Sequence, residues 1–167
     1  MIIPDTTLRD GNHAIGHSLK LSDISVYSKA AEEAGVHVVE VGHGNGLGAS
    51  SMQVGICAEN DIEMLEPAKP VLNATTLATH MIPGFATIKR DLDPAIRAGL
   101  NVLRIGAHCT EINTTKRYVE HAKNYAVEAV CCLMMSSMVS TKTLVLQSLL
   151  AEEYGASAVS IYDSAGA

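Results

Sequence analysis

The sequence predicts an α/β fold built around a parallel sheet, and three observations indicate it. Apolar, β-branched runs alternate with segments of helical spacing at a period of about 30 residues, the pattern of successive βα units. The chain has 167 residues, and 47% of them are apolar, enough for one domain with a core. Glycines punctuate the pattern where helices are expected to end. The apolar runs begin near Ile2, His37, Asn73, Val102, Glu128 and Ala158.

The first expected strand is the run Met1-Ile2-Ile3, and a polar stretch follows it as far as Gly11. In a parallel barrel, Arg9, Asp10 and His13 would lie at the C-terminal end of this strand, where barrel enzymes carry their chemistry. Asp10 is a hard anionic ligand for a divalent metal, and Arg9 could bind a carboxylate or an enolate oxygen through two hydrogen bonds. His13 could transfer a proton near neutral pH. The alternative is a helix cap and a surface ion pair.

A helix and a second strand come next. We expect Ser22 to cap the helix and Gly35 to end it. The strand covers residues 37–42, and Glu40 lies inside this otherwise apolar run. Because a buried carboxylate needs a partner, we expect Arg9 to pair with Glu40 and so to be held for the substrate. A solvated acid at the end of the strand is the open alternative.

A glycine-rich loop, residues 43–48, follows the second strand. It has neither the Gly-Lys-Ser/Thr of a phosphate-binding loop nor the spacing of a dinucleotide fingerprint. We therefore expect a flexible loop over the site. A helix is predicted for residues 61–69, and a third strand for residues 73–81, which ends before the turn signal Pro83-Gly84. His80 lies near the end of this strand, as a packing residue or as part of a pocket.

The next helix and strand both carry residues that need an explanation. Pro94 interrupts an apolar spacing, which a helix with Asp93 as its cap and Pro94 as its first residue would resolve. The fourth strand covers residues 102–107, and Arg104 inside it implies an internal carboxylate partner. His108 follows the strand, where it could contact substrate or serve as a hydrogen-bonded structural residue.

Two further βα units complete the chain. Thr115 is expected to cap a helix, and the fifth strand covers residues 129–135. Ser140 is expected to cap the following helix, and Gly155 to end it. The sixth strand covers residues 158–163.

Composition excludes several classes of protein. The net charge of −6 argues against a nucleic-acid or anionic-membrane surface. No apolar run reaches the roughly 20 residues that span a membrane, and the N-terminus lacks the pattern of a secretory signal. The cysteines have no zinc-type spacing and are expected to be buried free thiols, so a cytoplasmic protein is predicted. They are Cys57, Cys109, Cys131 and Cys132.

Three motifs together resemble one superfamily. The stretch from Asp5 to Ala14 (Asp-Thr-Thr-Leu-Arg-Asp-Gly-Asn-His-Ala) resembles the opening motif of the metal-dependent aldolases and lyases. That superfamily includes isopropylmalate synthase, hydroxymethylglutaryl-CoA lyase and 4-hydroxy-2-oxovalerate aldolase. The pair Asn12-His13, the run His108-Cys109-Thr110-Glu111 and the run Leu133-Met134-Met135-Ser136 are similar to the last of these branches.

The resemblance implies a parallel (β/α)8 TIM barrel, of which about six strands are present here. Residues 1–167 would then be a partial catalytic domain and the N-terminal part of a longer enzyme. The superfamily completes its metal site with a His-x-His pair on the seventh strand. The seven histidines of this chain include no such pair.

The resemblance also implies the chemistry. The family cleaves a 4-hydroxy-2-oxo acid such as 4-hydroxy-2-oxopentanoate to pyruvate and an aldehyde, acetaldehyde, in the meta-cleavage catabolism of aromatic compounds. Asp10 corresponds to the ligand of a divalent metal, usually Mn²⁺, and Arg9 to the group that binds the 2-oxo oxygen. His13 corresponds to the base for the 4-hydroxyl, and Ser164 to a serine that binds the pyruvyl end. An acylating acetaldehyde dehydrogenase is the partner that the resemblance implies.

Two alternatives differ in class. One is a synthase or lyase of the same superfamily that uses an acyl-CoA, against which the pair Asn12-His13 argues. The other is a catalytically inactive βα module that docks onto another chain through its open edges. The aldehyde chain length, the stereochemistry, the oligomeric state and the roles of His43, His80 and His108 do not follow from the sequence.

Overall fold

The computed structural model describes residues 2–166, and it divides into two compact units. The first unit extends to Val102 and the second begins at Leu103, and each is described by itself. Within the described residues, no helix has the length and apolar character needed to cross a membrane.

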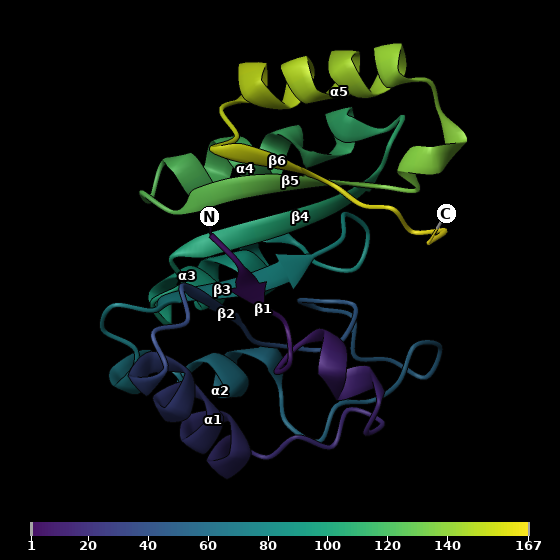
Figure 1. Cartoon of the computed structure of the whole chain (residues 1–167). Coiled ribbons are helices and arrows are strands. Elements are labelled where there is room, and N and C mark those ends of the chain that lie inside the picture. Colours follow the sequence, from purple (N-terminus) through teal and green to yellow (C-terminus); the bar gives the residue numbers. More distant parts are fainter. Residues whose placement is uncertain (1, 167) are drawn as a thin grey trace. The chain divides into compact units, whose positions relative to one another are not determined.

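Each unit is a succession of strands and helices (Figure 1). The first unit contains β1 (Pro4–Asp5), α1 (Leu21–Glu33), β2 (Val38–Glu40), α2 (Asp61–Leu65), β3 (Thr76–Met81) and α3 (Asp93–Arg97). The second contains β4 (Val102–His108), which begins at the boundary, α4 (Lys116–Lys123), β5 (Glu128–Met134), α5 (Thr141–Tyr154) and β6 (Ala158–Ile161).

The strands of each unit run parallel and follow one another in chain order. In the first unit β1 pairs with β2 and β2 with β3, so that Val39 lies opposite Asp5 on one side and Leu77 on the other. In the second unit β5 pairs with β6 from Val130 opposite Ala158. The parallel α/β arrangement that the sequence predicts is therefore confirmed, and it brings the C-terminal ends of β1, β2 and β3 to one edge.

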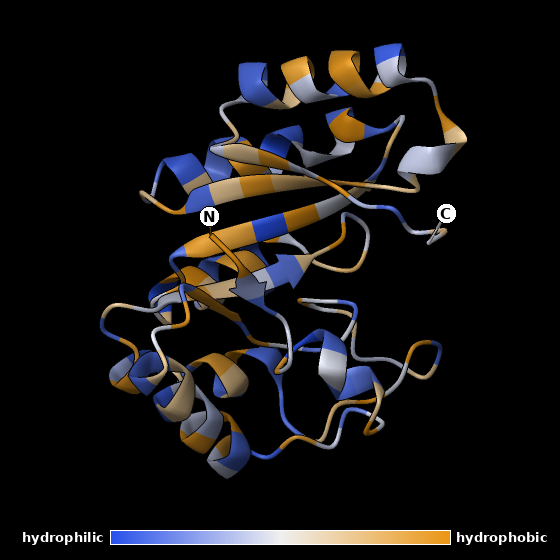
Figure 2. Cartoon of the chain, viewed as in Figure 1, coloured by the Kyte–Doolittle hydropathy of each residue, from blue (hydrophilic) through white to orange (hydrophobic). Residues whose placement is uncertain are grey.

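The core of each unit lies between strands and the apolar faces of helices. In the first unit Val39 and Leu77 are fully buried, as is Ile24 on the inner face of α1. In the second unit Tyr118 and Val119 of α4 are fully buried. Both hydrophilic and hydrophobic residues occur along each helix (Figure 2).

The first strand is shorter and later than predicted. Met1 lies outside the described residues, and Ile2 and Ile3 precede β1 with exposed fractions of 73% and 58%. The strand itself is Pro4–Asp5. Proline is compatible with this place because the first residue of a strand need not donate a hydrogen bond. The apolar run at residues 1–3 therefore predicted the strand a few residues too early.

Two of the predicted helix starts are wrong, and a third is right in position but lacks the expected capping bond. Helix α1 begins at Leu21, before Ser22, and the backbone N–H of Lys20 donates to Asp23 Oδ2 over 3.0 Å. Asp93 is a helical residue and not a cap, because a π-helical turn, Ile88–Leu92, leads directly into α3. Thr115 precedes α4, but its hydroxyl donates to the carbonyl of Ile112 and does not cap the helix.

The predicted ends of α5 are confirmed. The Ser140 hydroxyl accepts a hydrogen bond from the backbone N–H of Thr143 over 3.2 Å. Gly155 ends the helix with φ of 98°, a left-handed conformation that glycine adopts at low cost.

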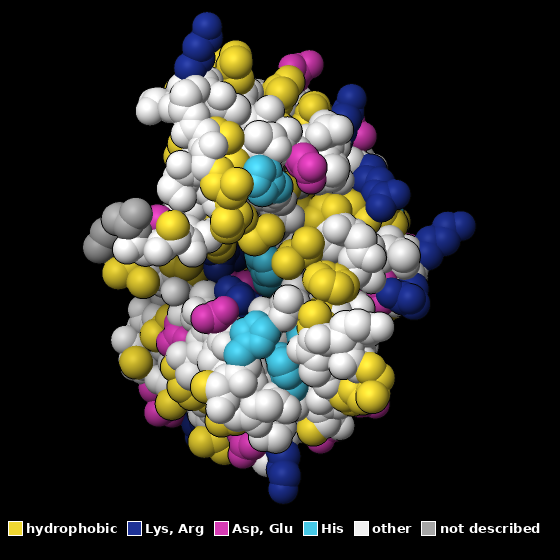
Figure 3. All heavy atoms as spheres, turned by 90° about the vertical axis from the view of Figure 1, so that its right-hand side faces the viewer, with side chains coloured by type: hydrophobic (Ala, Val, Ile, Leu, Met, Phe, Trp, Pro, Cys, Tyr) yellow, Lys and Arg dark blue, Asp and Glu magenta, His cyan; other side chains and the backbone are white. Residues whose placement is uncertain are grey.

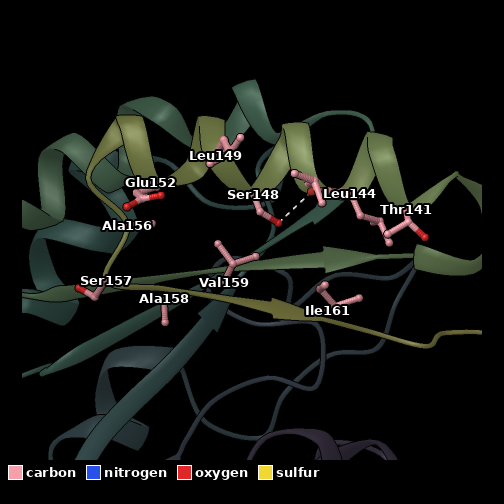
Figure 4. A pocket seen from close by; sticks show the side chains of 11 residues that line it. Thr141, Leu144, Ser148, Leu149, Glu152, Ala156, Ser157, Ala158, Val159 and Ile161 are labelled. Atoms are coloured by element: carbon pink, nitrogen blue, oxygen red, sulfur yellow. Dashed lines mark hydrogen bonds between the residues drawn. The ribbon is translucent and has the colours of Figure 1, made fainter.

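An open apolar groove lies between α5 and β6 in the second unit (Figure 4). It has a volume of about 440 Å³, and Val145 and Leu149 of the helix and Val159 and Ile161 of the strand are among its lining residues. Val145, Leu149 and Ile161 are each more than half exposed. This face of the second unit is therefore an uncovered hydrophobic surface.

Candidate active site

The predicted Arg9, Asp10 and His13 lie directly after the C-terminal end of β1, as the sequence indicates. The carbonyl of Thr6 accepts hydrogen bonds from the backbone N–H groups of Arg9, Asp10 and Gly11. A 3-10 turn at Asp10–His13 follows, in which the N–H of Asn12 donates to the Arg9 carbonyl and the N–H of Ala14 to the Gly11 carbonyl. The side chain of Arg9 is 11% exposed and that of Asp10 is 65% exposed, so neighbouring residues of this stretch differ in burial.

Arg9 is buried and held by three hydrogen bonds. Its Nε donates to Glu40 Oε1 over 3.1 Å, and its Nη1 donates to Asp10 Oδ1 over 2.8 Å and to the Gly44 carbonyl over 3.0 Å. The pairing of Arg9 with Glu40 that the sequence predicts is therefore present. Glu40 is fully buried, so its charge requires this partner. The Nη2 group makes no hydrogen bond within the described residues, which leaves two N–H donors for another ligand.

His80 lies on the other side of Glu40. Its Nδ1 is 3.7 Å from Glu40 Oε1, and its side chain is 5% exposed. The residue is therefore a buried neighbour of the Arg9–Glu40 pair, which agrees with the packing role left open by the sequence. Glu40 lies between two groups that can both carry positive charge.

Asp10 differs from Arg9 in its exposure. Its side chain is 65% exposed, although Oδ1 already accepts from Arg9. A divalent metal binds through several oxygen or nitrogen ligands. The described residues contain no group of three or more His, Cys, Asp or Glu side chains that could hold a metal ion. Asp10 fits such an ion as one ligand, and its exposed carboxylate leaves room for more.

His13 is exposed and lies against the glycine-rich loop. A Cβ on Gly44 would be only 2.3 Å from His13 Nε2, so only glycine lets the imidazole lie here. The same Gly44 carbonyl binds Arg9. The loop is therefore a packed wall of the site and not the flexible cover that the sequence predicts.

Asp61 holds this wall in place. Its carboxylate accepts hydrogen bonds from the backbone N–H of His43 over 3.3 Å and from that of Gly48 over 2.8 Å. Burial raises the pKa of Asp61, and these two bonds oppose the rise. Sequence reasoning placed this residue only at the start of a helix, because nothing local shows that the loop folds back onto it.

Two more histidines join His13, and sequence reasoning assigned a role to neither. The ring centroids of His13 and His17 are 4.9 Å apart, and those of His17 and His43 are 3.9 Å apart in a parallel stack. Figure 3 shows histidine side chains gathered beside basic and acidic ones on one face. The spacing of four residues between His13 and His17 was the available signal.

Asn12 supports the same turn from inside. It is fully buried, its Nδ2 donates to the Gly42 carbonyl over 3.3 Å, and its Oδ1 accepts from the backbone N–H of Leu19 over 3.5 Å. It ties the turn after β1 to the loop after β2, so this asparagine has a structural role.

The remaining predicted residues lie in the second unit. Ser164 accepts a hydrogen bond from the backbone N–H of Met135 over 3.0 Å. Arg104 donates to the hydroxyl of Tyr162 and lies over its ring. His108 Nδ1 is 2.8 Å from the Thr110 hydroxyl, a local contact that agrees with a structural histidine. The carboxylate partner expected for Arg104 stays a prediction.

Comparison with known proteins gives close relatives. A family model described as HMGL-like matches residues 1–167. The chain is 54% identical over 165 residues to 4-hydroxy-2-oxovalerate aldolase 2 of Salinispora arenicola, covering 99% of this chain and 47% of that protein. It is 48% identical to 4-hydroxy-2-oxovalerate aldolase of Spirochaeta aurantia, covering 49% of that protein. The chain thus spans about half the length of the curated relatives it matches.

The solved structures that it resembles are more distant in sequence. The carboxyl transferase domain of Rhizobium etli pyruvate carboxylase, determined with pyruvate, superimposes with a TM-score of 0.75 at 17% identity. The match covers 99% of this chain and 31% of that one. These domains are TIM barrels, so the likeness confirms the predicted fold class.

Proposed function

The chain belongs to the HMGL-like family, and on that premise we propose that it carries the Arg9–Asp10–His13 part of an aldolase active site. The reaction is the cleavage of a 4-hydroxy-2-oxo acid, 4-hydroxy-2-oxopentanoate, to pyruvate and acetaldehyde. The observation that carries the proposal is the buried Arg9, fixed by Glu40 and Gly44, beside an exposed carboxylate and an exposed imidazole. The names of the relatives support the substrate class.

Arg9 binds the 2-oxo oxygen. Cleavage of the C3–C4 bond leaves the electron pair on the pyruvate fragment as an enolate, whose negative charge lies largely on that oxygen. The two free N–H groups of Nη2 donate to it, and the bonds strengthen as charge develops. Glu40 and Gly44 hold the guanidinium in place beforehand, so little reorganisation accompanies the reaction.

His13 accepts the proton of the 4-hydroxyl. Removal of this proton lets the C4–O bond become the aldehyde carbonyl as the C3–C4 bond breaks. Imidazole suits the step because its protonation changes near neutral pH. Exposure of the ring beside Gly44 gives a substrate access to it.

Asp10 would supply one carboxylate ligand to a divalent ion, which we propose to be Mn²⁺. When bound, the ion supplies Lewis acidity toward the 2-oxo acid end of the substrate. Ser164, after β6, is proposed to bind the pyruvyl end, which the family resemblance alone supports. The same is true of an acylating acetaldehyde dehydrogenase as partner and of a place in aromatic catabolism. The free cysteines support a cytoplasmic location.

The test uses two variants of the enzyme that contains this sequence. Replacement His13→Ala is expected to lower kcat by about 100-fold to 10,000-fold, the usual contribution of a general base, with a small effect on KM. Replacement Asp10→Asn is expected to weaken Mn²⁺ binding measured by calorimetry. His37→Ala is the control, since His37 is an exposed histidine that immediately precedes β2. Unchanged turnover in His13→Ala would remove His13 from the mechanism.

A further inference from the structure

His17 has features that are costly for a residue with no role. Its φ is 60°, in the left-handed region, which is uncommon for residues other than glycine although Asn, Asp and His adopt it more often than the rest. Its side chain is buried, at 5% exposure, and its Nε2 makes no hydrogen bond within the described residues. Backbone strain and an unsatisfied buried nitrogen each destabilise a fold, and both are found preferentially where function requires them.

His43 is the rigid base beneath His17. Its Nδ1 accepts from the backbone N–H of Asn45 over 2.9 Å, and its Nε2 lies 3.0 Å from the Gly55 carbonyl, to which it donates. Both ring nitrogens are thus held, and the ring cannot turn without losing a bond. His17 stacks on this ring at 3.9 Å with an angle of 10° between the planes.

Two glycines leave the space in which the rings of His13 and His17 lie. A Cβ on Gly55 would be 2.5 Å from His17 Nδ1, just as one on Gly44 would be 2.3 Å from His13 Nε2. The edge of His13 then meets His17, with centroids 4.9 Å apart and planes at 72°. This edge-to-face contact is a preferred geometry for aromatic rings.

We propose that His17 is a positioning residue, which holds the imidazole of His13 beside Gly44 by stacking on the fixed ring of His43. It acts through His13, and the proposal rests on the proposed role of His13 as the base. Burial lowers the pKa of His17, and the neighbouring His43 and His13 lower it further, which favours the uncharged form of the His17 ring. An uncharged ring next to a proton acceptor adds no competing positive charge.

The decisive variant is His17→Asn. Asparagine, like histidine, is among the residues other than glycine that tolerate positive φ, so the backbone conformation can be kept while the aromatic ring is lost. We expect the chain to remain folded in urea denaturation and kcat to fall about 100-fold with little change in KM, the cost of misplacing a catalytic group by about 1 Å. His17→Phe keeps a ring and is expected to recover most of kcat. His37→Ala is again the control.

A second readout does not depend on activity. In the metal-free chain, NMR spectra should show a nuclear Overhauser effect between the ring protons of His13 and His17. The ring signals of His13 should move in His17→Asn and stay near their wild-type positions in His17→Phe. If the His13 signals do not move in His17→Asn, or if kcat stays at the wild-type value, the proposal is wrong.

These two readouts separate the proposals. A wild-type enzyme without aldolase activity would refute the proposed function, and the NMR result would still decide whether His17 orients His13. If His17→Asn does not fold, the ring contact in the wild type and the signals of His17→Phe decide instead. Absence of the His13–His17 contact in the folded wild type overturns the inference.

Discussion

Gly44 is the point at which a single methyl group should damage the site most. An alanine Cβ there would lie 2.3 Å from His13 Nε2 and needs about 3.4 Å, so the imidazole must move by about 1 Å. A displacement of that size costs about 100-fold in rate, or about 2.7 kcal/mol of transition-state stabilisation. Gly44 has no positive φ, so the backbone itself accepts alanine.

The assay is steady-state cleavage of 4-hydroxy-2-oxopentanoate, with pyruvate detected by a coupled dehydrogenase. If the ring moves, kcat falls and KM changes little, since Arg9 keeps the Gly44 carbonyl as its partner. If the loop moves instead, the Arg9 contact lengthens and KM rises as well. Gly11→Ala is the matched control, because its Cβ would meet Thr7 at an ordinary 3.7 Å. Wild-type kcat and KM in Gly44→Ala would show that the missing side chain of Gly44 does not set the position of His13.

Three other predictions concern stability and association. Glu40→Gln should destabilise the fold by up to roughly 3–5 kcal/mol in urea denaturation, because it breaks a buried ion pair and leaves the buried Arg9 with the largely exposed Asp10 as its anionic partner. Glu32 has a pKa lowered to about 2 by backbone N–H groups of residues 73–75, so stability should fall as the pH drops from about 4.5 toward 2, and Glu32→Gln should flatten this part of the pH profile. Leu149→Gln should reduce self-association of the 167-residue chain in sedimentation, because Leu149 is 55% exposed in an apolar groove.

The hydrogen bonds of Glu32 explain why stability should fall, and not rise, as the pH drops. Three backbone N–H groups, of Asn73, Ala74 and Thr75, favour the ionised carboxylate in the folded state. The folded state therefore holds fewer protons than the unfolded chain between the two pKa values. The stabilisation is complete above the unfolded value of 4.5 and is lost as the pH falls toward 2. A flat stability profile over that range would contradict the assignment.

Much of the fold could be predicted because βα units repeat a local pattern. Strand β3 appears as an apolar run, and Gly155 marks the end of α5 by a conformation that glycine tolerates. Local pattern failed where the chain departs from standard geometry. The π-helical turn Ile88–Leu92 absorbs the spacing that Pro94 interrupts, and no propensity signals such a turn. The observed ends of strands and helices differ from the predicted ends by a few residues, because hydrophobicity does not determine which backbone groups form hydrogen bonds.

Some contacts of the candidate site could likewise be predicted from the sequence, and others could not. The pairing of Arg9 with Glu40 could be predicted, since a carboxylate inside the otherwise apolar β2 calls for a partner and Arg9 follows the end of the neighbouring β1. The contact of His17 with His43 could not, because it joins two loops whose paths depend on non-local hydrogen bonds. One such bond runs from the backbone N–H of Ala58 to the His17 carbonyl, across 41 residues of sequence by their numbering.

Gly44 contacts both groups proposed to act on the substrate, Arg9 and His13. Its carbonyl fixes the guanidinium proposed to bind the enolate oxygen, and its missing side chain leaves the space in which the proposed base lies. Any shift of this residue therefore affects both the Arg9 guanidinium and the His13 imidazole. The bonds from Asp61 to the N–H groups of His43 and Gly48 hold the segment on either side of Gly44. The loop that resembles a flexible cover in the sequence is thus better understood as the rigid spacer that sets the distance between Arg9 and His13.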